Sequence, residues 1–390
     1  MKIAIDTLFE HPERPTSAID YLVNLVASLP AEGPQHDFYA LTSPRNRRYF
    51  VDGHHRNLHL VNCGISNEHR GLRILAQQGI IPAQMRRYGI DALFAAGNVC
   101  PAVGGFCRVL KINTLHHILT PNLIGWARSR YRRYAFAASA RRADHIVANS
   151  AATKADICRF MSISEEKVSV VWEAVDEVFR PVSKQQRDRF LADFGLRPDY
   201  ILFVSSLWPY KNPETLLRAF AILSKERHFD LDLVFVGRDD NSYQQKLEEL
   251  AGDLGIRQRT RFLGAIPNRQ MPAVYSAARV FVYPSLAETF GKPLVEAMRC
   301  GVPVVASNVT SIPEVLGDAG LLVDPRDVDR LAAAIRRAAT DEALRRDMIA
   351  RGLSRGDLFS WTEVARRTLQ ITEAAHCQWK QREGRNGRPN

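Results

Sequence analysis

Short apolar runs alternate with amphipathic segments through the first half of the chain. The apolar runs predict strands at Ile3–Asp6, Phe38–Thr42, Leu58–Val61, Ala92–Ala95, Val109–Asn113 and His145–Ala148. The segments between them have helical periodicity and predict helices at Ala18–Leu29, Leu72–Tyr88, Gly125–Ala143 and Ala151–Met161. Strands that alternate with amphipathic helices indicate a parallel, doubly wound sheet.

The same alternation starts again after a proline-containing stretch that ends near Pro181. It predicts strands at Tyr200–Ser205, Leu231–Val236, Thr260–Leu263, Val280–Tyr283, Val302–Ala306 and Leu321–Val323. Helical patterns fill the gaps, including Pro213–Ser224, Tyr243–Leu254 and Asp327–Ala339. Two successive series of this kind indicate two Rossmann-like α/β domains, in which ligands bind at the carboxyl ends of the strands.

We therefore expect a first domain over residues 1–180, a second over residues 181–358, and a C-terminal helix with a basic tail over residues 359–390. The tail from Cys377 to Asn390 is polar and basic, so we expect it to fray. With 390 residues, 46% of them apolar and 24% charged, the chain is long enough for two separate cores.

The cysteines and the start of the chain bear on its location. Six cysteines lie apart with no C-x-x-C pair, which argues against a zinc site or a disulfide framework and fits a reducing cytosol. The N-terminus lacks the apolar core of a signal peptide, and no run approaches the roughly 18 apolar residues of a membrane span. We expect a cytoplasmic protein.

The net charge of +11 is concentrated in one part of the chain. Residues 40–142 contain 16 Lys and Arg against three acidic residues. Such an excess favours an anionic partner, either a phosphate-bearing substrate or an anionic lipid surface, and the alternative is a solvated basic face. No recognisable nucleic-acid-binding module accompanies the charge, so nucleic acid is not expected.

Two carboxylates, Glu288 and Glu296, lie eight residues apart around a Phe-Gly turn between a predicted strand and a predicted helix. Paired acids can act as a glycosidase pair, or they can accept hydrogen bonds from the hydroxyls of a sugar and a ribose. A structural alternative is that acids are simply favoured near a helix N-terminus. A ligand at this junction would also meet free backbone N–H groups, which suits a polyhydroxylated, phosphate-bearing molecule.

The segment Glu288-Thr-Phe-Gly-Lys-Pro-Leu-Val-Glu296 resembles the E-x7-E motif of the retaining glycosyltransferases of family 4, also called glycosyl transferases group 1. Pro284-Ser285, Cys300-Gly-Val-Pro-Val-Val and Ile312-Pro-Glu-Val are also similar to that family. The resemblance implies the GT-B fold, with two Rossmann-like domains that face each other across a cleft. It also implies that the helix around Phe359-Ser-Trp361 crosses back onto the N-terminal domain.

In this family the first Glu contacts the donor sugar and the second contacts the donor ribose. The resemblance therefore assigns the sugar hydroxyls to Glu288 and the ribose to Glu296. The residues between them, Thr289, Phe290, Gly291 and Lys292, are expected to bind the donor, with backbone N–H groups of Phe290 and Gly291 directed at the sugar or diphosphate.

A second segment, Ser205-Ser206-Leu-Trp-Pro-Tyr-Lys211, ends a predicted strand. An ammonium group at Lys211 can neutralise a diphosphate as it leaves. Relatives usually have Gly at the first position and a second cation near the end, where this chain has Ser205 and Tyr210, so Arg238 is the candidate for the missing charge.

Two further regions carry expected contacts. Gly264 and Ile266 resemble the loop that contacts the nucleobase in relatives, which leaves the base open between GDP and UDP. His116 resembles the active-site histidine of the N-terminal domain, and His117 is a candidate contact to the acceptor. Where relatives have Gly-Gly after the first strand, this chain offers Thr16 and Ser17 as phosphate or acceptor contacts.

The resemblance implies that a hexose-type sugar moves, with retention, from a nucleotide diphosphate donor to a glycan acceptor. We expect no metal and no cofactor. The basic stretch favours a polyprenyl-diphosphate-linked acceptor at the inner face of the cytoplasmic membrane, as in O-antigen or exopolysaccharide synthesis. The alternatives are a transferase with a soluble acceptor, a GT-B-fold sugar-nucleotide epimerase and a non-catalytic binding protein. Glu288, Glu296 and Lys211 argue against the last of these.

Overall fold

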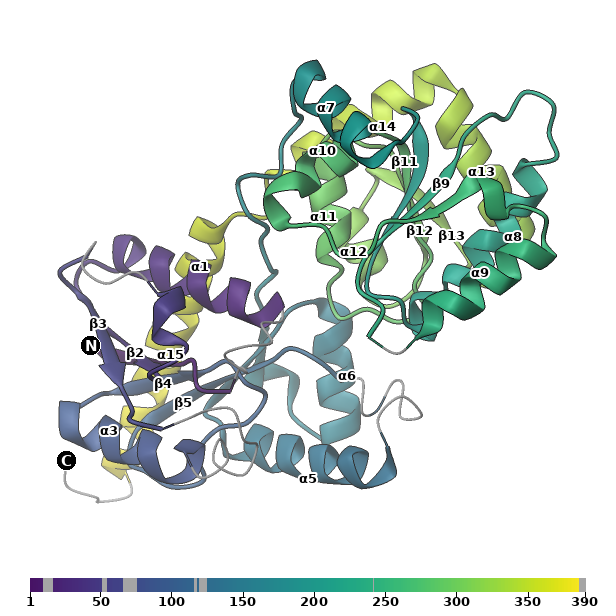
Figure 1. Cartoon of the computed structure of the whole chain (residues 1–390). Helices are drawn as coiled ribbons and strands as arrows, with labels where there is room; N and C mark the ends of the chain where they lie inside the picture. The colour runs from purple at the N-terminus through teal and green to yellow at the C-terminus, as the bar shows by residue number, and fades with distance from the viewer. Residues whose placement is uncertain are drawn as a thin grey trace. The chain divides into compact units, whose positions relative to one another are not determined.

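The computed structural model describes residues 1–9, 17–50, 55–65, 76–115, 118, 125–240 and 242–385. The chain divides into two compact units (Figure 1). Unit 1 comprises Met1–Glu173 and Ser360–Asn390, and unit 2 comprises Ala174–Phe359. The first boundary was predicted at residue 180, whereas unit 1 gives way to unit 2 after Glu173. The second boundary was predicted between residues 358 and 359, and the chain returns to unit 1 after Phe359.

Unit 1 is built on a seven-stranded parallel sheet in the order β3-β2-β1-β4-β5-β6-β7. Its strands are β1 (Lys2–Asp6), β2 (Asp37–Thr42), β3 (Leu58–Asn62), β4 (Ala92–Ala95), β5 (Cys107–Ile112), β6 (His145–Ala148) and β7 (Val168–Val170). The direction of winding reverses between β1 and β4. The predicted parallel sheet is confirmed, and the three-residue edge strand β7 is an addition that its short sequence did not signal.

The helical elements of unit 1 are α1 (Ser17–Glu32), η1 (Arg47–Tyr49), η2 (Ala76–Ile80), α3 (Ile81–Tyr88), α5 (Trp126–Arg142), α6 (Ala151–Met161), η4 (Glu165–Lys167) and α15 (Trp361–Arg385). The C-terminal helix α15 packs against α1 and against strands β4, β5 and β6. The C-terminal helix, after the chain has returned from unit 2, is therefore part of unit 1.

The prediction of a frayed tail was wrong for Cys377 to Arg385, which belong to α15, and residues 386–390 lie outside the described residues. Ala375 and His376 are buried on this helix. Beyond them, Arg382 forms an ion pair with Asp144 of unit 1. These tertiary contacts hold a polar sequence in a helix that its composition alone does not stabilise.

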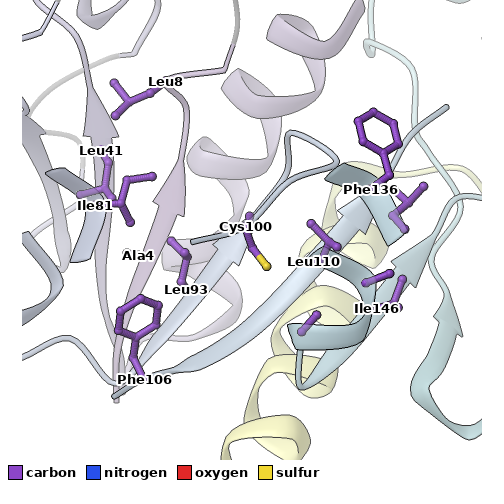
Figure 2. Close-up of a cluster of buried hydrophobic side chains, with 14 of the residues drawn as sticks. Ala4, Leu8, Leu41, Ile81, Leu93, Cys100, Phe106, Leu110, Phe136 and Ile146 are labelled. Carbon is purple, nitrogen blue, oxygen red and sulfur yellow. The ribbon is translucent and has the colours of Figure 1, made fainter. Parts of the chain in front are cut away.

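The core of unit 1 collects side chains from both the sheet and the helices that cover it (Figure 2). Leu93, Leu110 and Ile146 come from three neighbouring strands, while Ile81 comes from α3 and Phe136 from α5. A parallel sheet covered on both faces needs nearly continuous apolar strands. This requirement explains why the apolar runs located the strands.

Unit 2 is built on a six-stranded parallel sheet in the order β10-β9-β8-β11-β12-β13. Its strands are β8 (Tyr200–Val204), β9 (Leu233–Val236), β10 (Thr260–Phe262), β11 (Ala278–Tyr283), β12 (Val304–Ser307) and β13 (Gly320–Val323). Here the winding reverses between β8 and β11. The loops that follow these two strands diverge from each other, which is where sheets of this kind bind ligands.

The helical elements of unit 2 are α7 (Lys184–Phe194), η5 (Pro209–Lys211), α8 (Pro213–Leu223), α9 (Tyr243–Asp253), η6 (Arg257–Arg259), η7 (Asn268–Gln270), α10 (Met271–Ser276), α11 (Lys292–Arg299), α12 (Ile312–Leu316), α13 (Val328–Thr340) and α14 (Glu342–Gly356). Ser183 forms a capping box at the start of α7, and Asp327 and Asp341 cap α13 and α14.

Asp6 ends β1 at the reversal point of the first sheet and is fully buried. Burial raises the pKa of its carboxyl group from 3.8 to about 6. Hydrogen bonds from the Leu8 backbone N–H (2.8 Å) and Gln77 Nε2 (3.1 Å) oppose the shift only in part. The folded state therefore takes up a proton on Asp6 more readily than the unfolded state does.

This raised pKa predicts a pH-dependent loss of stability. As pH rises from about 4 to about 6, the contribution of Asp6 to the free energy of unfolding should fall, because the buried carboxylate must then carry its charge. Asp6→Asn removes that cost and should raise the free energy of unfolding at pH 7 by roughly 1–3 kcal/mol, with the gain vanishing below about pH 4. Urea unfolding at a series of pH values measures both effects.

Asp253→Asn, at an exposed position of α9, is the matched control and should change stability at neither pH. If Asp6→Asn were less stable than the natural protein at pH 7, the carboxylate would be stabilising the fold and the interpretation would be wrong.

Candidate active site

Loops from both sides of the reversal point meet at the carboxyl edge of the sheet in unit 2. Asn212, in the loop after β8, is buried and donates hydrogen bonds through Nδ2 to the carbonyl oxygens of Pro284 (3.0 Å) and Pro325 (2.7 Å). Its Oδ1 accepts a hydrogen bond from the Thr215 hydroxyl (2.7 Å). One amide side chain thus fixes the loop after β8 against the loops after β11 and β13.

The central feature of this edge is an ion pair between Lys211 and Glu288, with Nζ and Oε1 2.6 Å apart. Lys211 ends η5 after β8, and Glu288 lies in the loop after β11. Their side chains are only 12% and 9% exposed. The hydroxyl of Tyr283 lies 3.4 Å from Nζ, and the ring centroids of Tyr210 and Tyr283 lie 4.9 and 5.6 Å from it.

The surroundings keep Lys211 charged. Burial is the largest single influence and disfavours the ammonium form, but Glu288, Tyr283 and Tyr210 together outweigh it, so the pKa of Lys211 lies above its ordinary value. Burial, reinforced by Glu288, raises the pKa of Tyr283 well above its ordinary value, and burial also raises the pKa of Tyr210. At neutral pH the site therefore holds a fixed cation beside two protonated phenols.

The loop after β11 is fixed by the loop after β12. The backbone N–H of Glu288 donates to Thr310 Oγ1 (3.0 Å). The hydroxyl of Ser311 donates to the carbonyl oxygens of Glu288 (3.1 Å) and Phe290 (3.2 Å). Gly291 then adopts a φ of +95°, which favours glycine, and α11 begins at the next residue. The N-terminus of that helix thus directly follows the loop that carries Glu288.

Glu296 lies within α11 and has a different partner. Its Oε2 accepts a 2.7 Å hydrogen bond from the phenol of Tyr275, which is fully buried at the end of α10. Burial first, and then the Glu296 carboxylate, raises the pKa of Tyr275 well above its ordinary value. Tyr275 therefore remains a hydrogen-bond donor and sets the direction of the Glu296 carboxylate.

Backbone hydrogen bonds join the carboxyl ends of β8, β9 and β10. Ser205 N–H donates to Val236 O (3.0 Å), and Gly237 N–H donates to Gly264 O (2.8 Å). A Cβ atom at Gly237, where φ is +148°, would lie 1.9 Å from Ser205 O. Only glycine fits here, and the close approach holds the ends of β8, β9 and β10 together.

The structure brings some of the predicted residues together and leaves others apart. Lys211 and Glu288 are in contact, and the predicted run Thr289, Phe290, Gly291 and Lys292 connects Glu288 to α11. Arg238 is 53% exposed and its Nε lies 3.7 Å from Asp240 Oδ2. Ile266 is half-buried in the loop after β10. The binding roles of these residues stay predictions.

Most of the site residues predicted in unit 1 lie outside the part of the chain that the structure describes. His116, His117 and Thr16 lie outside the described residues, and Ser17 is described only as the first residue of α1. Among the residues that the structure describes, no group of three His, Cys, Asp or Glu side chains is arranged to hold a metal ion.

Sequence reasoning missed several residues that shape the site. Tyr283 lies beside Lys211 and Asn212 anchors its loop, although both adjoin predicted motifs and could have been noticed there. Tyr210 was noted only as the residue in place of a second cation, and the position of its ring beside Lys211 was not predicted. Tyr275 gave no signal, because its link to Glu296 arises only from the packing of α10 against α11. The same holds for Ser311, which contacts the loop of Glu288 from the loop that follows β12.

Comparisons with known proteins agree with this geometry. The sequence model described as "Glycosyl transferases group 1" matches residues 184–355, and that described as "Glycosyltransferase Family 4" matches residues 20–179. The O-antigen chain mannosyltransferase B of Escherichia coli is 36% identical over 247 residues, which are 62% of this chain and 64% of that protein. The serotype-specific mannosyltransferase WbdA of Escherichia coli is 32% identical over 232 residues, 59% of this chain and 28% of that protein. The match thus spans less than two thirds of either relative.

Solved structures share the fold. A sucrose-phosphate synthase from Thermosynechococcus elongatus superimposes with a TM-score of 0.77 at 22% identity, covering 97% of this chain and 100% of that one. Anabaena Alr3699/HepE in complex with UDP gives a TM-score of 0.72 at 19% identity over 96% and 99% of the two chains. WaaG, a glycosyltransferase of lipopolysaccharide biosynthesis, gives 0.69 at 17% identity over 95% and 99%. The predicted GT-B fold is confirmed.

The buried ion pair predicts a strong dependence of Glu288 on Lys211. Lys211→Met leaves a buried carboxylate without its cation and should lower the free energy of unfolding by about 3 kcal/mol. Combining it with Glu288→Gln should recover more than half of that loss, because the stranded charge is then removed. Urea unfolding of the two single variants and the double variant measures the coupling.

Lys246→Met is the control, since Lys246 pairs with Glu214 on the exposed surface of the same unit and should change stability by less than about 1 kcal/mol. Strictly additive losses in the double variant of Lys211 and Glu288 would show that the pair is not coupled.

Proposed function

Because the chain belongs to the glycosyl transferases group 1 family, we propose that it transfers a hexosyl group from a nucleotide diphosphate sugar to a glycan acceptor. The observation that carries the proposal is the buried Lys211–Glu288 pair at the reversal point of the unit 2 sheet, directly before the N-terminus of α11. This arrangement offers a cation, a carboxylate and the positive end of a helix dipole to one ligand.

Lys211 is the group assigned to the diphosphate. When the bond between the sugar C1 atom and the phosphate oxygen breaks, negative charge grows on the departing nucleoside diphosphate, and a cation already in place stabilises it. The backbone N–H groups of Phe290 and Gly291 are assigned to the sugar or diphosphate, and the positive end of the α11 dipole adds to the stabilisation of negative charge. Together these groups take the role of a divalent cation, so we propose a reaction that needs no metal and no cofactor.

Glu288 and Glu296 are assigned to the hydroxyls of the donor. A diphosphate that binds Lys211 competes with Glu288 for the ammonium group, and the carboxylate then accepts hydrogen bonds from the sugar instead. Tyr275 fixes the Glu296 carboxylate through the 2.7 Å hydrogen bond, which suits recognition of the ribose diol. Ser205, Arg238, Gly264 and Ile266 remain candidate contacts to the rest of the nucleotide.

We propose that transfer proceeds with retention by attack on the same face of the sugar. The acceptor oxygen forms its bond to C1 as the phosphate leaves, and the departing phosphate oxygen takes the proton of the acceptor hydroxyl. In this scheme Glu288 binds the sugar and forms no covalent bond to it. His116 and His117 are proposed to contact the sugar or the acceptor.

The names of the relatives narrow the substrate. Two of them are Escherichia coli mannosyltransferases, one of the O-antigen chain and one serotype-specific, so a mannosyl group is the first sugar to test. We propose a polyprenyl-diphosphate-linked glycan of a bacterial surface polysaccharide as the acceptor, used at the inner face of the cytoplasmic membrane. The basic excess of residues 40–142 supports contact with an anionic surface. Within the described residues, no helix combines the length and apolarity needed to cross a bilayer.

Glu288→Gln separates a binding role from a nucleophilic one. If Glu288 binds sugar hydroxyls, kcat should stay within about threefold of the natural enzyme, while the donor KM rises about tenfold, the effect of one weakened hydrogen bond to a charged acceptor. Initial rates at varied donor concentration measure both constants. Glu249→Gln, on the exposed surface of α9, should change neither. A glycosyl-enzyme adduct detected by mass spectrometry would overturn the binding role.

A thermal-shift panel identifies the base. UDP, GDP, ADP and dTDP sugars are each added at saturating concentration with EDTA present throughout. The proper donor, which we expect to carry GDP or UDP, should raise Tm by about 2–4 °C, and Lys211→Met should abolish the shift. A shift that appears only after Mg²⁺ or Mn²⁺ is restored would contradict metal independence, and no shift with any donor would contradict the proposed function.

A further inference from the structure

Helix α5 of unit 1 is unusually basic. Its 17 residues include six arginines and no acidic residue. The helix buries Ser129, Phe136, Ser139 and Ala140 on the side that packs against the unit. In Figure 1 it runs along the lower edge of unit 1. The remainder of its circumference therefore faces away from the core.

The outward side of α5 combines aromatic rings with arginines. Trp126 is 78% exposed, Tyr134 is 75% exposed and Tyr131 is 49% exposed. Residues four apart lie in line on a helix, so Arg130 stands between Trp126 and Tyr134. Arg133 and Arg141 lie along one side of this line, and Tyr131 lies along the other. We call this surface the arginine–aromatic face, and its residues are Trp126, Arg130, Tyr131, Arg133, Tyr134 and Arg141.

The described residues of the protein do not neutralise the charge on this face. Across the described part of the chain, Arg130, Arg133 and Arg141 form no ion pair, whereas exposed arginines of unit 2 such as Arg197 and Arg336 are paired with acidic residues. Like charges at this spacing repel one another. Large exposed aromatic rings add a second cost, because they leave apolar area in water. An anionic, partly apolar partner would relieve both.

We propose that the arginine–aromatic face docks on the surface of an anionic phospholipid bilayer. Guanidinium groups bind phosphate in a bidentate manner, which suits lipid headgroups. Trp and Tyr favour the headgroup level of a bilayer, where one part of the ring is apolar and the other is wet. An interfacial helix with basic and aromatic residues on one face needs no membrane-spanning segment.

The biological purpose of docking rests on the proposed function, since docking would bring the enzyme to a lipid-linked acceptor. Lipid binding itself does not depend on sugar transfer, because α5 belongs to unit 1 whereas Lys211 and Glu288 belong to unit 2. Binding to lipid and transfer of sugar can therefore be measured and lost independently.

Vesicle co-sedimentation tests the proposal. The natural protein should bind vesicles of phosphatidylglycerol and phosphatidylcholine at low ionic strength, bind pure phosphatidylcholine at least about tenfold more weakly, and lose most of its binding at high ionic strength. The triple variant Arg130→Glu, Arg133→Glu and Arg141→Glu should bind the anionic vesicles at least about tenfold more weakly. Its positions are exposed, so unchanged circular dichroism and Tm would show that it folds.

A matched variant separates the face from net charge. Arg218→Glu, Arg337→Glu and Arg346→Glu make the same change in charge at exposed positions of α8, α13 and α14, and should bind vesicles as the natural protein does. Trp126→Ser with Tyr134→Ser should weaken binding severalfold, with most of that loss persisting at high ionic strength.

Equal losses in the two arginine variants would overturn the proposal, as would unchanged binding by the variant of α5. Tighter binding of the natural protein to duplex DNA or to an acidic protein than to anionic vesicles would also overturn it and assign the face to another partner. Vesicle binding without transfer to any acceptor would instead refute the proposed function and leave this inference standing.

Discussion

The site in unit 2 depends on one interaction, the buried ion pair between Lys211 and Glu288. Lys211 follows β8 and Glu288 follows β11, the two strands between which the winding reverses. The pair therefore connects two loops that would otherwise diverge. Asn212 strengthens the same connection with two hydrogen bonds to neighbouring loops. Because a buried charge without a partner is costly, each member of the pair fixes the position of the other. The loop that leads to α11 is held in place as a consequence.

In the proposed reaction, this pair also explains how a single cation can serve a diphosphate. Taking an ammonium group out of water is unfavourable, and the folded unit already meets that cost through Glu288. An arriving phosphate exchanges one anionic partner of Lys211 for another, so binding requires little further desolvation of the cation. Tyr210, at the position of the second cation in relatives, places its ring 4.9 Å from Nζ. It supports the charge of Lys211 in place of adding a charge of its own.

The parts that could be predicted from sequence are those set by local pattern. Buried parallel strands appear as apolar runs, and Lys211 and Glu288 could be recognised because each closely follows such a run. Tyr275 could not, since its hydrogen bond to Glu296 depends on how two helices pack. The end of α15 was mispredicted for a related reason, because the contact of Arg382 with Asp144 is invisible in a polar sequence. Site residues that follow a recognisable strand could therefore be predicted from sequence, whereas contacts between segments far apart in the chain could not.

The two sheets differ in the partners of the carboxyl group at the reversal point, and this difference affects where anions can bind. In unit 2 a carboxylate at that point is matched by a buried ammonium group, which suits the edge to the proposed diphosphate. In unit 1 Asp6 occupies the corresponding edge, accepts hydrogen bonds from Leu8 and Gln77, and has a pKa raised to about 6 by burial. The positive charge of α5 lies instead on the outer surface of that unit. A buried carboxyl beside the β1 edge repels a second anion, so the excess charge of unit 1 is better suited to an extended anionic surface than to a diphosphate within the sheet edge.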